Sequence, residues 1–417
     1  MSKPVKLLSL VVVCACVLLA INFGMRASFG FFMAPISSDF GYGREVFAFS
    51  LALQNLCWGL FQPVAGAIAD RFGATKTIYI GSLAYALGLY VTATADSYWG
   101  LHMGAGILVG MGIAGTGFGV ILPALARIVS EQNRGIALGL GTAAGSFGQL
   151  LVIPVAQEFI AAYGWQITLM ILAGGSLCML LLSGPFRNNG QHFHPGHAEK
   201  EQEPVQNQSL SAALKEASRH VHYWLLIAGF FVCGFQLAFI TVHMPAYLSD
   251  HGFDAKVAVI SLSLIGFFNI FGCLLFGSWS SKYSKKNLLG IIYLIRAVAI
   301  AAFMLIPITT TSIYLFSMVT GFLWLATVPP TSGLVAQMFG LKHMGSLYGI
   351  VFLNHQLGSF LGVWLGGYLY DTTGSYNNVW WAGAAIALAT AAIHIIIDER
   401  PVRRLRKAAL QTTSQAA

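Results

Sequence analysis

The stretch Gly66-Ala-Ile-Ala-Asp70-Arg71-Phe-Gly73-Ala-Thr-Lys76 separates two long apolar segments. Asp70, Arg71 and Lys76 would be expensive to place in hydrocarbon, so the stretch is expected to be a loop at a membrane surface. Gly66 lets a neighbouring helix approach closely, and Gly73 permits a tight turn. Each flanking segment is long enough to cross the ~30 Å of a bilayer's hydrocarbon core. The stretch therefore predicts two membrane-spanning helices joined by a short charged loop.

The same apolar character extends over the whole chain of 417 residues, of which 56% are hydrophobic and 9% are charged. A soluble protein carries roughly 25% charged residues, so an aqueous globular domain is excluded. The first apolar segment is too long for a signal peptide and is expected to be a spanning helix. Twelve spanning helices are predicted, at about 7–34, 45–69, 77–95, 99–129, 135–160, 165–185, 223–246, 256–280, 288–306, 312–338, 345–370 and 377–397.

The charges are distributed unevenly between the two faces that this topology defines. Of the 23 Lys and Arg residues, only Arg44 and Lys256 fall on one face, while Arg26 and Arg296 lie within apolar segments. The remaining nineteen are Lys3, Lys6, Arg71, Lys76, Arg127, Arg134, Arg187, Lys200, Lys215, Arg219, Lys282, Lys285, Lys286, Lys342, Arg400, Arg403, Arg404, Arg406 and Lys407. Such a bias places both termini in the cytoplasm of a multi-pass inner-membrane protein, and it explains the net charge of +8 without a nucleic-acid partner.

The chain divides into two similar halves. We expect a first six-helix bundle at 1–187, a cytoplasmic linker with a short amphipathic helix at 188–222, a second six-helix bundle at 223–399 and a basic cytoplasmic tail at 400–417. Glycines repeat between the halves at an offset of 210 or 211 residues, which predicts an internal repeat. The matched pairs include Gly24 and Gly234, Gly41 and Gly252, Gly66 and Gly277, Gly148 and Gly358, and Gly164 and Gly374.

The loop at 66–76 resembles the signature loop of the major facilitator superfamily, Gly-x-x-x-Asp-Arg-x-Gly followed by basic residues. The resemblance implies an all-α membrane fold of twelve helices in two pseudo-symmetric bundles. It also implies that Gly66, Asp70, Arg71 and Gly73 act as a conformational latch. In the second half Lys282 takes the basic position, but Ser281 stands where the acid would be, so a charge latch is expected to be asymmetric.

Two buried ionisable residues point to an organic anion. The first helix, around Arg26, resembles that of the monocarboxylate transporters, where an essential lysine stands at this place. A guanidinium can bind a carboxylate through two hydrogen bonds. His355 follows Tyr348 by seven positions, and this spacing resembles the helix of the oxalate/formate branch that carries a lysine. A histidine titrates near physiological pH, so His355 is the expected site of any proton coupling, next to Arg26.

Uncharged polar residues on the remaining apolar segments complete the expected substrate site. The candidates are Asn22, Gln54, Asn55, Gln149, Gln236, Thr241, Asn354 and Gln356, together with Asn269. Arg296 suits a structural role as well as substrate contact, and His243 suits the outer gate. The six cysteines all lie in apolar segments with no metal-ligand spacing, so neither a metal site nor a cofactor is expected.

The sequence predicts a secondary transporter that moves a small organic anion, specifically a monocarboxylate, by alternating access as a monomer within the lipid bilayer. Proton coupling, by His355 or by the substrate, stays open. One alternative is an efflux pump for a toxic or amphipathic compound, and another is a transporter-like sensor that signals without transport. No nucleophile motif or nucleotide loop supports an enzyme.

Overall fold

The computed structural model describes residues 3–128, 131–190, 208–340 and 343–406, and it describes side chains outside 3–9, 70, 126–139 and 188–190. The described elements are all helices. Within these residues, seven helical runs meet both length and apolarity requirements for a membrane span. The other crossings are interrupted by helix breaks or carry more polar residues.

The first half contains six crossings built from ten helical segments. These are α1 (Lys3–Ser28), η1 (Phe29–Phe32), α2 (Met33–Phe40), α3 (Arg44–Phe72), α4 (Ala74–Ala93), α5 (Tyr98–Leu101), η2 (His102–Leu108), α6 (Val109–Thr116), α7 (Phe118–Ile128) and α8 (Glu131–Leu182). The first crossing runs through α1, η1 and α2, the fourth through α5 to α7, and α8 supplies the fifth and sixth.

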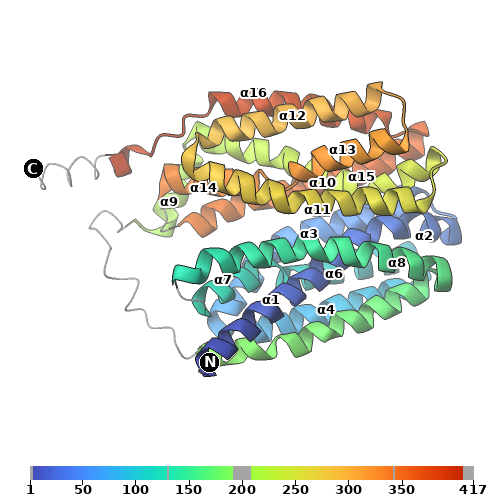
Figure 1. Ribbon diagram of the computed structural model, residues 1–417, viewed down its shortest axis with the longest axis horizontal. Helices are drawn as coiled ribbons and strands as arrows, with labels where there is room; N and C mark the ends of the chain where they lie inside the picture. Colours follow the sequence, from blue (N-terminus) through green and yellow to red (C-terminus); the bar gives the residue numbers. More distant parts are fainter. Residues whose placement is uncertain (1–2, 129–130, 191–207, 341–342, 407–417) are drawn as a thin grey trace, which may run out of the picture.

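The second half follows a short connecting region formed by η3 (Gly184–Gly190) and α9 (Leu210–Ser218). Its crossings are α10 (Val221–Asp250), α11 (Ala255–Lys282), α12 (Lys285–Leu305), α13 (Thr310–Phe322) with α14 (Val328–Phe339), α15 (Met344–Thr373) and α16 (Asn377–Ile396). Ser209 accepts a hydrogen bond from the Ala212 amide and caps α9, as its sequence predicts. Figure 1 shows α10 to α16 as one layer and α1 to α8 as the other.

The glycine repeat corresponds to equivalent positions in the two layers. Gly41 and Gly252 both have positive φ values, 65° and 80°, and so do Gly164 and Gly374, at 80° and 70°. Glycine adopts this left-handed conformation without strain, so these pairs mark equivalent ends of helices.

Close helix crossings repeat in the same way. A Cβ on Gly148 would collide with the carbonyl of Ala20 in α1, and a Cβ on Gly358 would collide with the carbonyl of Phe231 in α10. Small residues let helices in membranes approach this closely, so α1 against α8 and α10 against α15 are matching contacts of the repeat.

Three of the predicted helices differ from the structure. The first crossing extends to Phe40 through the tight turn η1, instead of ending near residue 34. The predicted helix at 312–338 is broken between Phe322 and Val328. The predicted helix at 99–129 contains a π-helical segment and a break at Gly117. Pattern alone does not locate these breaks, because the apolar character continues across them.

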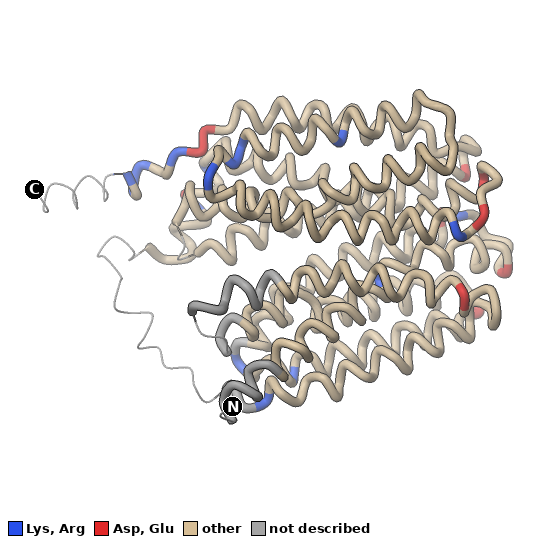
Figure 2. Tube along the Cα trace, in the orientation of Figure 1, with Lys and Arg blue, Asp and Glu red and all other residues tan. Residues whose placement is uncertain are grey.

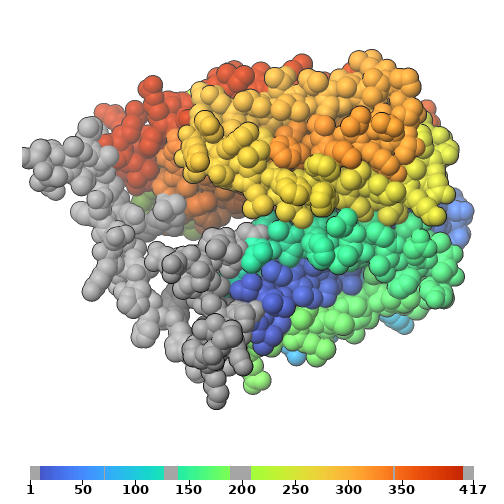
Figure 3. All heavy atoms as spheres, in the orientation of Figure 1, coloured from blue at the N-terminus to red at the C-terminus, as the bar shows by residue number. Residues whose placement is uncertain are grey.

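The two ends of the molecule carry opposite charges (Figure 2). The basic end lies where α3 and α11 end, and it includes Arg71 and Lys282 in the last turns of those helices. The acidic end includes Asp39, Asp250 and Asp371. On the face drawn in Figure 3, the halves meet along one seam, where α8 lies against α11.

Candidate functional site

Arg26 lies in the first half, close to the contact with the second, and has an unusual set of partners for a charged residue. Its Nη2 donates to the Asn55 side-chain oxygen at 2.7 Å, and its guanidinium carbon lies 5.0 Å from the centre of the Trp58 ring. Its Nε is buried and has no hydrogen-bond partner. Among the described side chains no carboxylate forms an ion pair with it. A partly buried guanidinium held by a neutral amide and an aromatic face keeps N–H donors and a positive charge that no described acidic group balances.

A row of aromatic rings joins Arg26 to the second half. Trp58 on α3 lies 5.4 Å from Phe352 on α15, and Phe352 is stacked on the His355 ring at 5.8 Å. His355 was predicted to lie next to Arg26. The described contacts run from Arg26 to Trp58, from Trp58 to Phe352 and from Phe352 to His355, and the direct pairing of His355 with Arg26 stays a prediction.

His355 is almost completely buried. Its ring lies 4.8 Å from the ring of Phe230, a residue of the second-half core. Its Nδ1 is 3.3 Å from the side-chain oxygen of Gln356. His355 therefore bridges the interface and the interior of the second half.

Gln356 is a predicted residue of the second half that contacts the first half close to the partners of Arg26. Its Cβ and Cγ lie against Gly59 of α3, one helical turn beyond Asn55. The Gln356 amide nitrogen is fully buried and has no partner. The structure thus brings Arg26, Asn55 and Gln356 to one region of the contact between α1, α3 and α15.

The other predicted polar residues make local hydrogen bonds. Asn22 donates to Thr116 and Gln54 donates to the Ala105 carbonyl, both within the first half. Asn354 donates to the Ile227 carbonyl within the second. Such bonds stabilise helix–helix contacts.

Predicted residues on three further helices have partners other than Arg26. Thr241 bonds to the Leu237 carbonyl of its own helix. Asn269 crosses the seam, donating to Ser146 on α8 while accepting from the Leu325 amide. Gln149 lies on the same seam, against Gly266.

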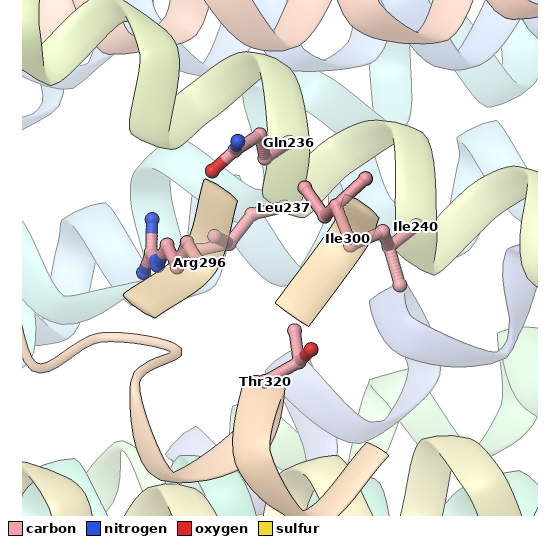
Figure 4. A pocket seen from close by; sticks show the side chains of 6 residues that line it. All are labelled: Gln236, Leu237, Ile240, Arg296, Ile300 and Thr320. Carbon is pink, nitrogen blue, oxygen red and sulfur yellow. The ribbon is translucent and has the colours of Figure 1, made fainter. Parts of the chain in front are cut away.

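Arg296 and Gln236 form a separate group inside the second half (Figure 4). Arg296 is 3% exposed, and its Nη2 donates to the Leu323 and Trp324 carbonyls in the break between α13 and α14. Gln236 donates to the Gly383 carbonyl, while its Oε1 has no partner and faces a small cavity shared with Arg296. The cavity has room for about one water molecule. Arg296 therefore donates to the free carbonyls at the helix break. Gln236 lies beside Arg296 at the small cavity and not beside Arg26.

The acidic end is closed by charged contacts between the halves. Arg44 of α3 makes two hydrogen bonds of 2.6 Å to the carboxylate of Asp250 on α10. Asp371 of α15 accepts from the backbone amides of Arg44 and Glu45, capping the N-terminus of α3. Trp364 donates to Glu45 at 3.0 Å. Among the described residues, every ion pair between the halves lies at this end.

At the basic end, Gly73 has a φ of 92° and ends α3, and Arg71 and Lys282 are exposed. The side chain of Asp70 lies outside the described residues. In the second half, where Ser281 replaces the acid, the Glu399 carboxylate accepts from the amides of Lys285 and Lys286 at the start of α12. An anion from the C-terminal segment thus occupies a helix N-terminus next to the second loop.

Sequence reasoning missed Trp58, Phe352 and the Arg44–Asp250 pair. Trp58 stands three residues after Asn55 and so shares its helix face, which is a usable signal. Arg44 is one of only two basic residues that the topology assigns to the acidic end, which also marks it as unusual. Nothing local in the sequence indicates Phe352, because aromatic residues are common in this chain.

Two six-helix halves packed around a shared interface define the class of multi-pass membrane transporters. The chain belongs to the Major Facilitator Superfamily, whose family model matches residues 15–363. The fold and the relatives are those of transporters and not of enzymes.

Two curated relatives cover most of the chain. It is 27% identical to an uncharacterized MFS-type transporter, YcxA, of Bacillus subtilis, with 92% of each chain covered. It is 24% identical to monocarboxylate transporter 13 of Bos taurus, over 91% of this chain and 86% of the relative. A solved structure of a bacterial homolog of the human lysosomal transporter Spinster, in an inward-facing and unoccupied conformation, has a TM-score of 0.72. At 16% identity, covering 95% of this chain and 96% of that one, it supports the shared fold.

Proposed function

We propose that this protein transports a small organic anion, specifically a monocarboxylate, across the inner membrane by alternating access. The observation that carries the proposal is Arg26, a guanidinium with a free buried Nε and a neutral partner at the interface of the halves. A carboxylate on Arg26 would supply the missing negative charge and accept two parallel hydrogen bonds. The monocarboxylate transporters among the relatives support this choice of substrate class.

The aromatic partners of Arg26 suit a small carboxylate with an apolar tail. Trp58 lies beside the guanidinium, and Phe352, from the opposite half, lies against Trp58. An apolar tail would bury surface against these rings while the carboxylate binds Arg26 and the amide of Gln356. Because the rings come from both halves, their contact must change when the halves move, which links substrate binding to the transport cycle.

The proposed orientation puts the basic end in the cytoplasm, following the positive-inside bias. The contacts at the acidic end then keep the outer side of the described conformation closed. The inward-facing state named for the Spinster homolog is consistent with this assignment. A periplasmic reporter fused at the C-terminus should be inactive, and an active one would overturn the orientation.

A thermal-shift screen of the purified protein tests the substrate class. We expect short-chain monocarboxylates to raise the melting temperature, because a ligand that binds only the folded state stabilises it by mass action. Matched amides of the same carbon skeleton serve as the control, since they keep the size but lack the charge. Stabilisation by amphipathic cations instead of carboxylates would favour an efflux pump and contradict the proposal.

A further inference from the structure

A chain of hydrogen bonds runs from the closed acidic end into the core of the second half. Arg44 Nη1 lies 3.2 Å from the Tyr376 hydroxyl, which lies 3.1 Å from Nδ1 of His243. The other ring nitrogen of His243, Nε2, lies 2.8 Å from the carbonyl oxygen of Val363. His243 and Val363 belong to α10 and α15, and Tyr376 precedes α16.

The direction of every bond in this chain follows from its two ends. A carbonyl oxygen only accepts, so Nε2 of His243 carries a hydrogen. In a neutral imidazole Nδ1 then accepts, and the Tyr376 hydroxyl must donate to it. A guanidinium only donates, so Arg44 donates to the Tyr376 oxygen. Burial raises the pKa of Tyr376, so its hydroxyl keeps the hydrogen that this arrangement needs.

The chain supports the ion pair that joins the halves. The Tyr376 oxygen holds Arg44, and Arg44 pairs with Asp250 and lies 4.0 Å above the ring of Tyr370. His243 is fully buried and fixes the orientation of the Tyr376 hydroxyl. The imidazole of His243 thus positions the Tyr376 hydroxyl for its contact with Arg44, although the imidazole does not itself bind Arg44.

We propose that His243 is a proton-sensitive positioning residue of the gate at the acidic end: the closed gate requires neutral His243, and protonation opens it. The role of this gate in transport rests on the proposed function, whereas the link between His243 and gate closure does not.

A proton on Nδ1 would conflict with the bond pattern. Nδ1 would become a donor facing Tyr376, whose oxygen would receive hydrogens from both His243 and Arg44 while its own hydrogen lost its acceptor. A second positive charge would also stand near Arg44. Closing the gate and protonating His243 therefore oppose each other, and by linkage gate closure releases the proton.

Other groups around His243 also titrate or carry charge. Those on the surrounding elements are Arg44 and Glu45 on α3, Tyr247, Asp250 and His251 at the end of α10, Tyr370 and Asp371 on α15, and Tyr376 before α16. Asp250 and Asp371 are the competitors, since protonation of either would also weaken the contact between the halves. The experiment must separate them from His243.

The distance between the halves at the acidic end provides a readout that needs no substrate. Spin labels at Asp96→Cys and Asn378→Cys, both at exposed positions of this end, report that distance in a background with Cys178→Ser. For the otherwise wild-type protein we expect one short distance at pH 8 and about a fivefold larger population of longer distances at pH 5.5.

Two variants of the histidine give opposite expectations. His243→Gln can donate to Val363 and accept from Tyr376 but does not titrate, so it should keep the short distance at both pH values. His243→Phe leaves Tyr376 without an acceptor, so longer distances should appear at both. Tyr376→Phe, at the other end of the bond, should give the same result if the histidine variant fails to fold.

A pH response that persists in His243→Gln would overturn the proposal and assign the effect to another titratable group at this end, such as His251, Asp250 or Asp371. An otherwise wild-type protein without any pH response would also overturn it. Either result would leave the carboxylate screen and the Arg26 assignment untouched.

Discussion

Two arginines lie within apolar helices of this protein, and their surroundings differ in kind. Arg26 is partly exposed near the contact between the halves, holds a neutral amide and an aromatic face, and keeps an unpaired buried Nε. Arg296 is buried within one half, and its Nε and Nη1 are also without a partner, but its Nη2 donates to the Leu323 and Trp324 carbonyls at a helix break.

The difference shows that a charge in a membrane helix does not by itself mark a binding site. Backbone carbonyls at a helix end carry partial negative charge, so they stabilise Arg296 without any ligand. Arg26 has no such partner among the described residues. The residue whose charge the protein leaves unbalanced is the better candidate for substrate binding.

The sharpest test replaces each arginine in turn, and the largest effect on carboxylate uptake is expected for Arg26. Arg26→Ala should lower carboxylate uptake into proteoliposomes by about 100-fold or more, because it removes a charge-assisted, two-point contact. The melting temperature of the purified protein should change little, since the side chain has one hydrogen-bond partner to lose.

Arg26→Lys is the matched control because it keeps the charge but offers no planar fork. Its uptake should fall between wild type and Arg26→Ala. Normal uptake by Arg26→Ala would contradict the assignment, and a collapse in folding would make Arg26 structural, like Arg296.

Arg296→Met should give the reverse pattern. Two buried carbonyls would lose their donor, which costs on the order of 2–4 kcal/mol, and the melting temperature should fall clearly. Carboxylate affinity per folded molecule, measured by titration, should stay within about twofold of wild type. Arg296→Lys should recover part of the stability, whereas a selective loss of affinity would make Arg296 a ligand.

The elements that the sequence predicted well are those with a local signal. The apolar segments on either side of the stretch from Gly66 to Lys76 fix two spans by length and polarity, but the stretch itself, expected to be a loop, is helical apart from Gly73, where α3 ends and α4 begins. The glycine pairs also indicate the repeat. A Cβ added at Gly148 or at Gly358 would collide with a backbone carbonyl of the helix packed against it, so glycine is needed at equivalent places in both halves.

The elements that were missed depend on residues far apart in the chain. Arg44 and Asp250 are separated by 206 positions, and their contact depends on which end is closed. The partners of Arg296 exist because the helix breaks after Phe322, which the apolar pattern does not show. The direction in which the His355 ring points depends on how α15 is rotated about its own axis. A pattern of polar residues does not determine that rotation.

A smaller effect is expected at the loop of the first half. Asp70→Asn should lower the transport rate by about three- to tenfold and change carboxylate affinity less, because a latch residue acts on the conformational cycle. Ser281→Asp, which restores the acid in the second half, is the matched variant, and it should leave the rate close to wild type because Glu399 already occupies the neighbouring helix start. An affinity loss with an unchanged rate in Asp70→Asn would contradict the latch assignment.

The smallest effect is expected for His355, which lies between the surroundings of the two arginines. Its ring stacks on Phe352, in the row that leads to Arg26, and it also lies 4.8 Å from the ring of Phe230 in the core of the second half, the half that holds Arg296. If His355 serves the anion on Arg26, His355→Gln should reduce pH-gradient-driven accumulation by a few fold. Exchange of labelled for unlabelled carboxylate without a gradient should stay near wild type, because exchange needs no net proton movement.

If His355 instead has a structural role like that of Arg296, the variant should lower the melting temperature and leave the steepness of accumulation unchanged. Measuring both quantities on one preparation separates these outcomes. A variant that concentrates carboxylate as steeply as wild type would exclude His355 as the proton carrier and leave the substrate itself, or the gate histidine, as the route for protons.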